Sequence, residues 1–205
     1  MTLGALTLVL ASGSPRRQEL LARLGLEVIV VAPGVDESPV VGEPPPIHAL
    51  RLAAEKARAV GALHPHLPVL AADTVVVLGE RIYGKPASRD EAARMLTELA
   101  GKTHLVLTAL ALCWRGREAA HLESARVTIV PYTRALFEWY VATGEGDDKA
   151  GAYAVQGKGA ALVERVEGNV QAVMGLPLGP LPALFARVGL EIAANGDRLQ
   201  LNRRD

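Results

Sequence analysis

The chain has 205 residues, half of them hydrophobic, and its 22 basic residues balance 22 acidic ones. This length allows a substantial core, and we expect one folding unit with two lobes. The balanced charge and an aromatic content of 4% argue against nucleic-acid binding, and no apolar run approaches the roughly 18 residues of a membrane-spanning helix, so we expect a soluble protein with no membrane partner.

The sequence also limits the cellular compartment and the redox chemistry of the protein. Cys113 is the only cysteine, which excludes an internal disulfide and a cysteine-based zinc site, and its apolar surroundings favour a small buried residue over a catalytic thiol. Residues 1–10 are apolar but have no Lys or Arg ahead of them, unlike a secretory signal. We therefore expect a cytoplasmic protein.

The first elements form a strand, a tight turn and a helix. The apolar run at residues 6–10 is followed by Ser14, a suitable N-cap, and by Pro15 at the first helical position. Gly25 suits the left-handed position at the helix end. Residues 27–31 read as a second strand.

A loop then precedes a helix and a hairpin. Residues 33–46 contain five prolines and two glycines, which excludes a regular element. Residues 47–61 form an amphipathic helix pattern, and residues 69–78 form a buried strand that turns back into residues 81–83.

The remaining elements mix helices and hairpins. Ser88 and Glu91 form a capping box for a helix that ends near Gly101. After it we expect strands at 104–114 and 119–130, a helix at 133–142, a glycine-rich stretch at 144–159, short strands within 160–173 and a helix at 180–188. This order predicts an α/β fold with a mixed, twisted sheet flanked by helices.

The turn after the first strand is the strongest candidate for binding phosphate. It places the hydroxyls of Ser12 and Ser14 and the guanidiniums of Arg16 and Arg17 at one helix N-terminus, where backbone N–H groups and the helix dipole favour an anion. An ordinary capped helix with two solvated arginines is the alternative interpretation.

Asp73 is the strongest candidate for catalysis, since a carboxylate inside an apolar strand requires a partner. A divalent cation, a lysine or a catalytic water would each serve, and a structural ion pair is the competing explanation. Asp36 and Glu37 in the proline-rich loop could contribute oxygens to the same cation, although a solvated loop is their default interpretation.

Three further side chains are weaker candidates. Lys56 and Lys85 could neutralise a polyphosphate, and Gln156 could hydrogen-bond a base edge; a solvated surface is the alternative for each. The five scattered histidines are expected at the surface. The sequence contains no P-loop, complete dinucleotide-binding, serine-hydrolase or zincin motif.

Taken together, the motifs resemble the Maf family over nearly the whole chain, from about residue 8 to about residue 188. They occur in family order: Ala11-Ser12-Gly13-Ser14-Pro15-Arg16-Arg17, Asp36-Glu37, Glu55-Lys56-Ala57, Ala72-Asp73-Thr74, Gly84-Lys85-Pro86, Gly101-Lys102-Thr103-His104, Asp148-Lys149-Ala150-Gly151, Gln156-Gly157 and Gly175-Leu176-Pro177.

The resemblance implies a single catalytic domain over residues 1–196, followed by a polar tail at 197–205, with a fold similar to that of the inosine triphosphate pyrophosphatases and a central cleft between two lobes. It implies hydrolysis of a nucleoside triphosphate between the α and β phosphates, with Asp73 as proton acceptor. It associates Arg16, Thr74 and Gln156 with base choice, and at these positions the chain looks like the subgroup that acts on dTTP and UTP.

The expected site follows from these implications. Mg²⁺ or Mn²⁺ would be held by Glu37 and Asp73, and the enzyme is expected to form a homodimer. The nucleoside triphosphate would be bound by Ser12, Ser14, Arg16, Arg17, Lys56, Thr74, Lys85 and Gln156.

Two alternatives stay open. The preferred substrate could be a purine or a modified nucleotide. The protein could instead bind a nucleotide without cutting it and regulate cell division, because the family takes its name from an effect on septum formation.

Overall fold

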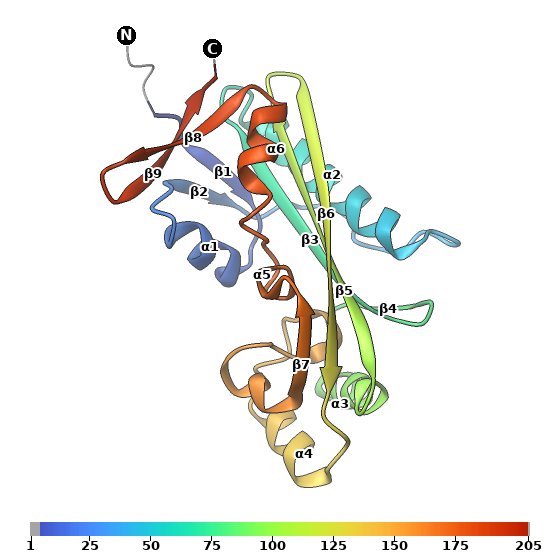
Figure 1. The fold of residues 1–205 in the computed structure, drawn as a ribbon. Helices are drawn as coiled ribbons and strands as arrows, with labels where there is room; N and C mark the ends of the chain where they lie inside the picture. The colour runs from blue at the N-terminus through green and yellow to red at the C-terminus, as the bar shows by residue number, and fades with distance from the viewer. Residues whose placement is uncertain (1–4, 205) are drawn as a thin grey trace. The chain divides into compact units, whose positions relative to one another are not determined.

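The computed structural model describes residues 5–204; residues 1–4 and 205, which belong to the predicted domain and tail, lie outside the described part. No helix among the described residues is long and apolar enough to cross a membrane. The elements are, in chain order (Figure 1), β1 (Leu8–Ala11), α1 (Pro15–Ala22), β2 (Val28–Val31), α2 (Pro45–Leu63), β3 (Val69–Leu78), β4 (Arg81–Tyr83), α3 (Arg89–Leu99), β5 (Thr103–Trp114), β6 (Arg117–Ile129), α4 (Arg134–Ala142), the 3₁₀ turns η1 (Ala150–Ala152) and η2 (Gly157–Leu162), β7 (Val163–Gly168), α5 (Val170–Val173), α6 (Leu181–Arg187), β8 (Leu190–Asn195) and β9 (Arg198–Arg203).

The main sheet is mixed. In the described part of the chain its strands follow the hydrogen-bonded order β2-β1-β3-β5-β6-β7, with β4 paired to β3. β1 runs parallel to both β2 and β3, whereas β4 is antiparallel to β3 and β7 is antiparallel to β6. The predicted α/β fold with a mixed sheet is therefore confirmed.

The chain divides into two compact units. Unit 1 comprises Met1–Asp73, Ala109–Leu122 and Gly175–Asp205, and unit 2 comprises Thr74–Thr108 and Glu123–Met174. The division falls between Asp73 and Thr74, so the predicted site residues are distributed over both units. The predicted cleft between two lobes stays a prediction.

Unit 1 contains the predicted strand, turn and helix at its N-terminus. Ser14 is the N-cap of α1 and Pro15 its first residue, as predicted, although the Ser14 side chain makes no cap hydrogen bond. Gly25 has a φ of 71°, and a Cβ at this position would approach the Arg198 side chain to 2.8 Å. Glycine is required there both by the backbone angle and by the close contact.

The core of unit 2 is formed by buried side chains from α3, α4, β5, β6 and the segment around η1. α3 begins as its sequence predicts, since Ser88 Oγ accepts a hydrogen bond from Glu91 N at 3.2 Å. The reciprocal half of the predicted capping box differs, because Glu91 Oε2 accepts from Ala87 N rather than from the N-cap residue.

Two local predictions are wrong. The end of the segment predicted as short strands is a helical turn, α5, which starts where Asn169 Oδ1 accepts from Gln171 N at 2.9 Å. Beyond Gly196 the chain forms β9, antiparallel to β8, rather than a free polar end. The alternation of polar residues with Leu201, which is buried, gives this strand one apolar side.

The prediction that all histidines lie at the surface is also wrong, since His48 and His104 are buried. In unit 2, His104 Nε2 lies 2.7 Å from the Tyr153 hydroxyl, and the two rings meet edge to face. The His104 Nδ1 atom is buried and has no hydrogen-bond partner among the described residues. Burial therefore lowers the pKa of the imidazole from 6.5 to about 4.

This depressed pKa predicts an acid-sensitive contribution to stability. The unfolded chain takes up a proton on His104 below pH 6.5, whereas the folded chain does so only near pH 4, so stability falls as the pH falls through this window. The loss should reach about 3 kcal/mol, at roughly 1.4 kcal/mol per pKa unit. Denaturant unfolding from pH 7 to pH 4 should show a shallower decline for His104→Gln than for the wild type. Parallel curves would refute the account, and His66→Gln, at an exposed position, is the matched control.

Candidate functional site

The turn after β1 is organised by Ser12 and Arg17. Ser12 Oγ accepts hydrogen bonds from Ser14 N at 3.2 Å and from the Arg17 guanidinium at 3.0 Å, and Arg17 Nε donates to Gly175 O at 2.8 Å. Arg17 is thus held within unit 1 and is not a solvated arginine. Arg16 makes no hydrogen bond or ion pair with the described residues and is only half-buried.

Asp73 lies close to this turn for a topological reason. β1 and β3 are parallel neighbours in which Ala11 is paired with Ala71, so both strands leave the paired region in the same direction. Ser12 follows one strand and Asp73 follows the paired part of the other. Side chains at the carboxyl ends of parallel strands are commonly used for ligand binding in open α/β sheets.

The Asp73 carboxylate is buried and is paired with a buried lysine. Lys56 Nζ, from α2, lies 2.6 Å from Asp73 Oδ1 and 2.7 Å from Glu37 Oε1. The Lys56 and Asp73 side chains are only 7% and 8% exposed, whereas that of Glu37 is 50% exposed. The structure therefore combines Glu37, Lys56 and Asp73 in one charged cluster.

The loop that carries Glu37 is fastened to α2 by Arg51. The guanidinium of Arg51 donates to both carboxylate oxygens of Glu43, at 2.7 and 2.8 Å, and to Ser38 O at 3.3 Å. His48 Nδ1 lies 2.9 Å from Glu43. The hydrogen bonds from Arg51 are the main reason that the pKa of Glu43 falls to about 2.

Asp36 does not join the charged cluster. Its Oδ1 accepts from the backbone N and the hydroxyl of Ser38, at 2.9 and 2.6 Å, so the carboxylate serves the turn of its own loop. Of Asp36 and Glu37, only Glu37 contacts Lys56.

The cluster fits a divalent cation. Asp73 Oδ2 is buried and accepts no hydrogen bond from the described residues, so one carboxylate oxygen lacks the partner that its burial requires. Within residues 5–204 no group of three or more His, Cys, Asp or Glu side chains forms a protein cage for a metal. Mg²⁺ at a nucleotide site does not need one, because it takes one or two carboxylates together with phosphate and water. The predicted ligands Glu37 and Asp73 meet this requirement.

The turn before α1, next to the cluster, has open space at Gly13. A Cβ built on Gly13 would meet no atom within 4 Å. Burial lowers the pKa of the Arg17 guanidinium, while the negative charges of Asp73 and Glu37 act in the opposite direction. An arginine and backbone donors therefore adjoin open space at the start of α1.

The remaining predicted residues belong to unit 2. Thr74 Oγ1 lies 2.9 Å from Thr108 Oγ1, and Thr108 donates to Ala172 O at 2.7 Å. Lys85 is exposed and makes no ion pair with the described residues. Gln156 is half-buried, and its side chain forms no hydrogen bond with described residues.

Sequence reasoning missed the residues that support these groups. Arg51 is one of several charged residues in the predicted amphipathic helix, and Thr108 lies within a predicted strand. Glu145, in the glycine-rich stretch, caps the backbone beside Gln156 by accepting hydrogen bonds from Lys158 N and Gly159 N. These contacts join residues that are 8 to 64 positions apart, farther than a helical turn or tight turn reaches, so no local pattern could have indicated them.

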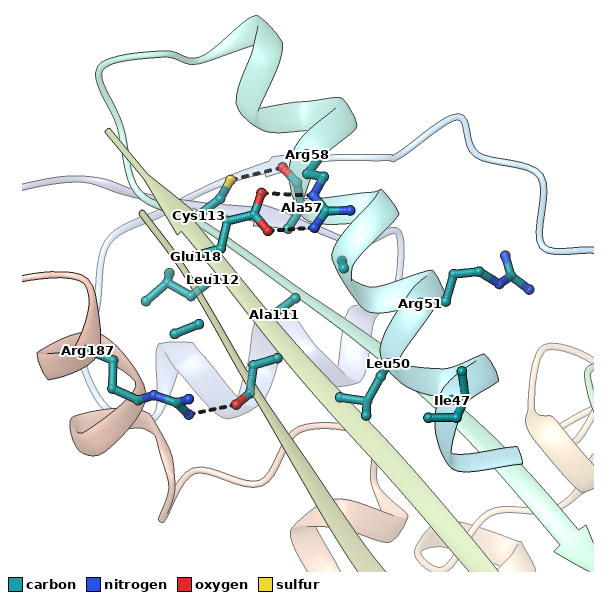
Figure 2. Close-up of a pocket in the computed structure, with 13 residues that line it drawn as sticks. Ile47, Leu50, Arg51, Ala57, Arg58, Ala111, Leu112, Cys113, Glu118 and Arg187 are labelled. Atoms are coloured by element: carbon teal, nitrogen blue, oxygen red, sulfur yellow. Dashed lines mark hydrogen bonds and ion pairs between the residues drawn. The ribbon is translucent and has the colours of Figure 1, made fainter. Parts of the chain in front are cut away.

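A pocket elsewhere in unit 1 contains none of the predicted site residues (Figure 2). Its charged groups are already paired with the protein: Arg58 with Glu118 at 2.6 Å, and Arg187 with Ala120 O at 2.8 Å. Cys113 also lines this pocket, where its thiol donates to Ala57 O and burial raises its pKa. A thiol with a raised pKa is a poor nucleophile, which agrees with the predicted structural role.

The described structure therefore defines a mixed α/β protein with a charged, partly open site where the parallel pairing of β1 with β3 ends. A family model described as Maf-like protein matches residues 7–188. The chain belongs to the Maf family, and the resemblance drawn from its motifs is confirmed.

Several curated relatives are similar over most of their length. A dTTP/UTP pyrophosphatase of Myxococcus xanthus is 49% identical over 90% of this chain and 94% of the relative. One of Anaeromyxobacter dehalogenans is 50% identical over 90% and 95%, and one of Symbiobacterium thermophilum is 44% identical over 92% and 97%. Among solved structures, the Ham1 protein of Staphylococcus aureus is 14% identical, with a TM-score of 0.42 over 60% of this chain and 72% of that one.

The buried ion pair predicts an asymmetric response to substitution. Lys56→Met leaves the Asp73 carboxylate buried without its cation, which should lower the free energy of unfolding by roughly 3–5 kcal/mol. Glu37→Gln removes a half-exposed partner and should cost at most about 1 kcal/mol. Denaturant unfolding at pH 7 measures both.

The double variant Lys56→Met/Asp73→Asn separates a charge effect from a packing effect. If the unpaired carboxylate causes the loss, the double variant should be more stable than Lys56→Met alone. Equal or greater destabilisation would show that packing of the Lys56 stem, rather than the charge pair, dominates.

Proposed function

We propose that this protein hydrolyses nucleoside triphosphates, dTTP and UTP in particular, to the monophosphate and pyrophosphate. The relatives that are 44–50% identical to it are named dTTP/UTP pyrophosphatases. The structural observation that carries the proposal is the asymmetric environment of Asp73: Oδ1 is fixed by Lys56, and buried Oδ2 has no hydrogen-bond donor among the described residues.

The triphosphate would bind at the start of α1. Backbone N–H groups of its first turn, the Ser14 hydroxyl and the Arg16 guanidinium would interact with phosphate oxygens, and Arg17 would add positive charge from its fixed position. The Ser12 hydroxyl already accepts hydrogen bonds from Ser14 N and Arg17, so we assign Ser12 to organising the turn. The Lys56 ammonium already contacts two carboxylates, so we assign it to holding Asp73 rather than to direct phosphate binding.

Asp73 would act as the acceptor of a proton from water. The water oxygen forms a bond to the α phosphorus, the bond from that phosphorus to the α–β bridging oxygen breaks, and pyrophosphate leaves. The proton released by the water passes to the Asp73 carboxylate. A positioned carboxylate base contributes roughly 10²- to 10⁴-fold to such a step.

Glu37 and Asp73 are the residues proposed to hold Mg²⁺ or Mn²⁺. When bound, the cation would supply positive charge to phosphate oxygens and to the leaving group. The loop anchored by Arg51 keeps Glu37 beside Lys56, so the second carboxylate is in place before a ligand binds. In unit 2, Lys85 is proposed to contact phosphate, and Thr74 and Gln156 the base.

Pyrophosphate release from UTP, dTTP, CTP, ATP and GTP, with Mg²⁺ or Mn²⁺, tests the proposal. Fast release is expected from UTP and dTTP, and Asp73→Asn should lower kcat by roughly 10²- to 10⁴-fold. Asp36→Asn is the matched control, because Asp36 is exposed and serves only its own loop, and its activity should equal that of the wild type. Substantial turnover by the folded Asp73→Asn protein would refute the assignment of the base.

The alternatives predict different results in the same assay. A nucleotide-binding regulator of septum formation would bind UTP without releasing pyrophosphate from any triphosphate. A purine-directed enzyme would prefer GTP or ATP. The dimeric state stays a prediction from the family resemblance.

The open space at Gly13 predicts a variant that loses substrate and keeps its fold. Gly13→Val adds a side chain whose Cβ meets no protein atom within 4 Å, so the unfolding midpoint should hardly change, whereas KM for UTP should rise about tenfold or more because the side chain adjoins the proposed phosphate position. Gly179→Val, at another open and exposed glycine, is the control. An unchanged KM for Gly13→Val would contradict phosphate binding at this turn.

A further inference from the structure

Gln156 occupies a capping position that its side chain does not use. It is the N-cap residue of η2, the position from which a short side chain such as Ser, Thr, Asp or Asn ordinarily accepts hydrogen bonds from the first backbone N–H groups of the helix. The Gln156 side chain makes no such bond. Some other group must therefore satisfy these donors.

The Glu145 carboxylate satisfies them instead. Its Oε1 accepts from Lys158 N at 3.0 Å, and its Oε2 accepts from Gly159 N at 2.6 Å. Both oxygens are thus committed to two successive N–H groups, and hydrogen bonds to an ionised carboxylate are stronger than those to a neutral oxygen. Glu145, which precedes η2 by a full loop, caps it in place of Gln156.

The same loop is fixed on the other side of Gln156. Ala154 N donates to the buried hydroxyl of Tyr140, from α4, at 3.1 Å. Glu145 is itself held, because its backbone N donates to Thr143 Oγ1 at 3.1 Å and the Lys149 ammonium donates to its backbone carbonyl. The backbone before and after Gln156 is therefore anchored to the end of α4 and the residues after it.

Close contacts show how tightly the carboxylate fits. Gly157 has a φ of 67°, and a Cβ at this position would lie 2.3 Å from Glu145 Oε1. A Cβ on Gly159 would lie 2.3 Å from Ala154 O and 2.9 Å from the Tyr140 hydroxyl. The two glycines allow the loop to close on Glu145 and Tyr140 with no side chain between them.

We propose that Glu145 is a positioning residue for base recognition: by capping η2 it leaves the Gln156 amide available for the edge of a uracil or thymine ring. An amide carries both donors and an acceptor, and the N3–H and O4 groups of these bases require one of each. The inference rests on the proposed function for the identity of the ligand. Its structural part, the capping of η2 by Glu145 in place of Gln156, does not.

Glu145→Gln is the informative substitution because it preserves shape. The amide keeps one oxygen to accept from one N–H group and turns an NH₂ group toward the other, which then loses its acceptor. The oxygen of the neighbouring Gln156 amide then becomes an alternative acceptor for that donor. Gln156→Ala removes the amide itself, and Glu164→Gln, at an exposed glutamate of β7, is the matched control.

Equilibrium binding of UMP and of ribose 5-phosphate, which lacks the base, tests the proposal by calorimetry. Glu145→Gln should weaken UMP binding about tenfold, the equivalent of one charge-assisted hydrogen bond, and should reduce the preference for UMP over ribose 5-phosphate. The double variant Glu145→Gln/Gln156→Ala should bind UMP no more weakly than Gln156→Ala, since both changes remove one interaction. Additive losses, or an unchanged UMP preference in Glu145→Gln, would overturn it.

A second measurement separates positioning from general damage. Amide hydrogen exchange in Glu145→Gln should accelerate at Lys158 and Gly159 and stay unchanged at Val127 and Ile129, in the core of unit 2. Acceleration throughout unit 2 would indicate a structural role and refute the proposal. Because UMP binding requires no turnover, a wild type that prefers UMP but releases no pyrophosphate would refute the proposed function and leave this inference standing.

Discussion

The Lys56 ammonium stands between two carboxylates, and the arrangement of unit 1 around the candidate site depends on that contact. β3 is almost entirely apolar where it is buried, so Asp73 would carry a large desolvation cost without a cation beside it. Lys56 reaches it from α2, whose buried face also packs on β1. The same ammonium holds Glu37, and through it the proline-rich loop. A single buried charge therefore joins a strand, a helix and a loop.

This contact also sets the chemistry of Asp73. A carboxylate with both oxygens paired would be a purely structural group, and one with neither paired would not persist in the core. Asp73 lies between these limits, since Lys56 engages Oδ1 while buried Oδ2 lacks a donor among the described residues. Because of this asymmetry, the proposal that Asp73 is a base or a metal ligand rests on the structure as well as on the names of the relatives. In unit 2, Glu145 caps η2 and so leaves the Gln156 amide available for the proposed base contact.

The sequence predicted local structure well where local physics determines it. The apolar run of β3 predicted its bounds, and Pro15 and Gly25 predicted the start and end region of the first helix. It predicted that Asp73 needs a partner but left a lysine, a cation and a water equally open. Choosing Lys56 requires knowing how α2 packs, which no single segment encodes. β9 was missed because its short polar sequence becomes a strand only by pairing with β8, and His104 was misplaced because its burial follows from tertiary packing against Tyr153.

The central claim is that water attacks the α phosphorus of a nucleoside triphosphate, and the fate of oxygen from water tests it most directly. Hydrolysis of UTP in ¹⁸O-labelled water, followed by mass spectrometry of both products, reports which phosphorus was attacked. The account predicts one ¹⁸O atom in UMP and none in pyrophosphate. Label in pyrophosphate would place the attack on the β phosphorus, and release of labelled or unlabelled orthophosphate with UDP would place it on the β–γ linkage; either result would contradict the account.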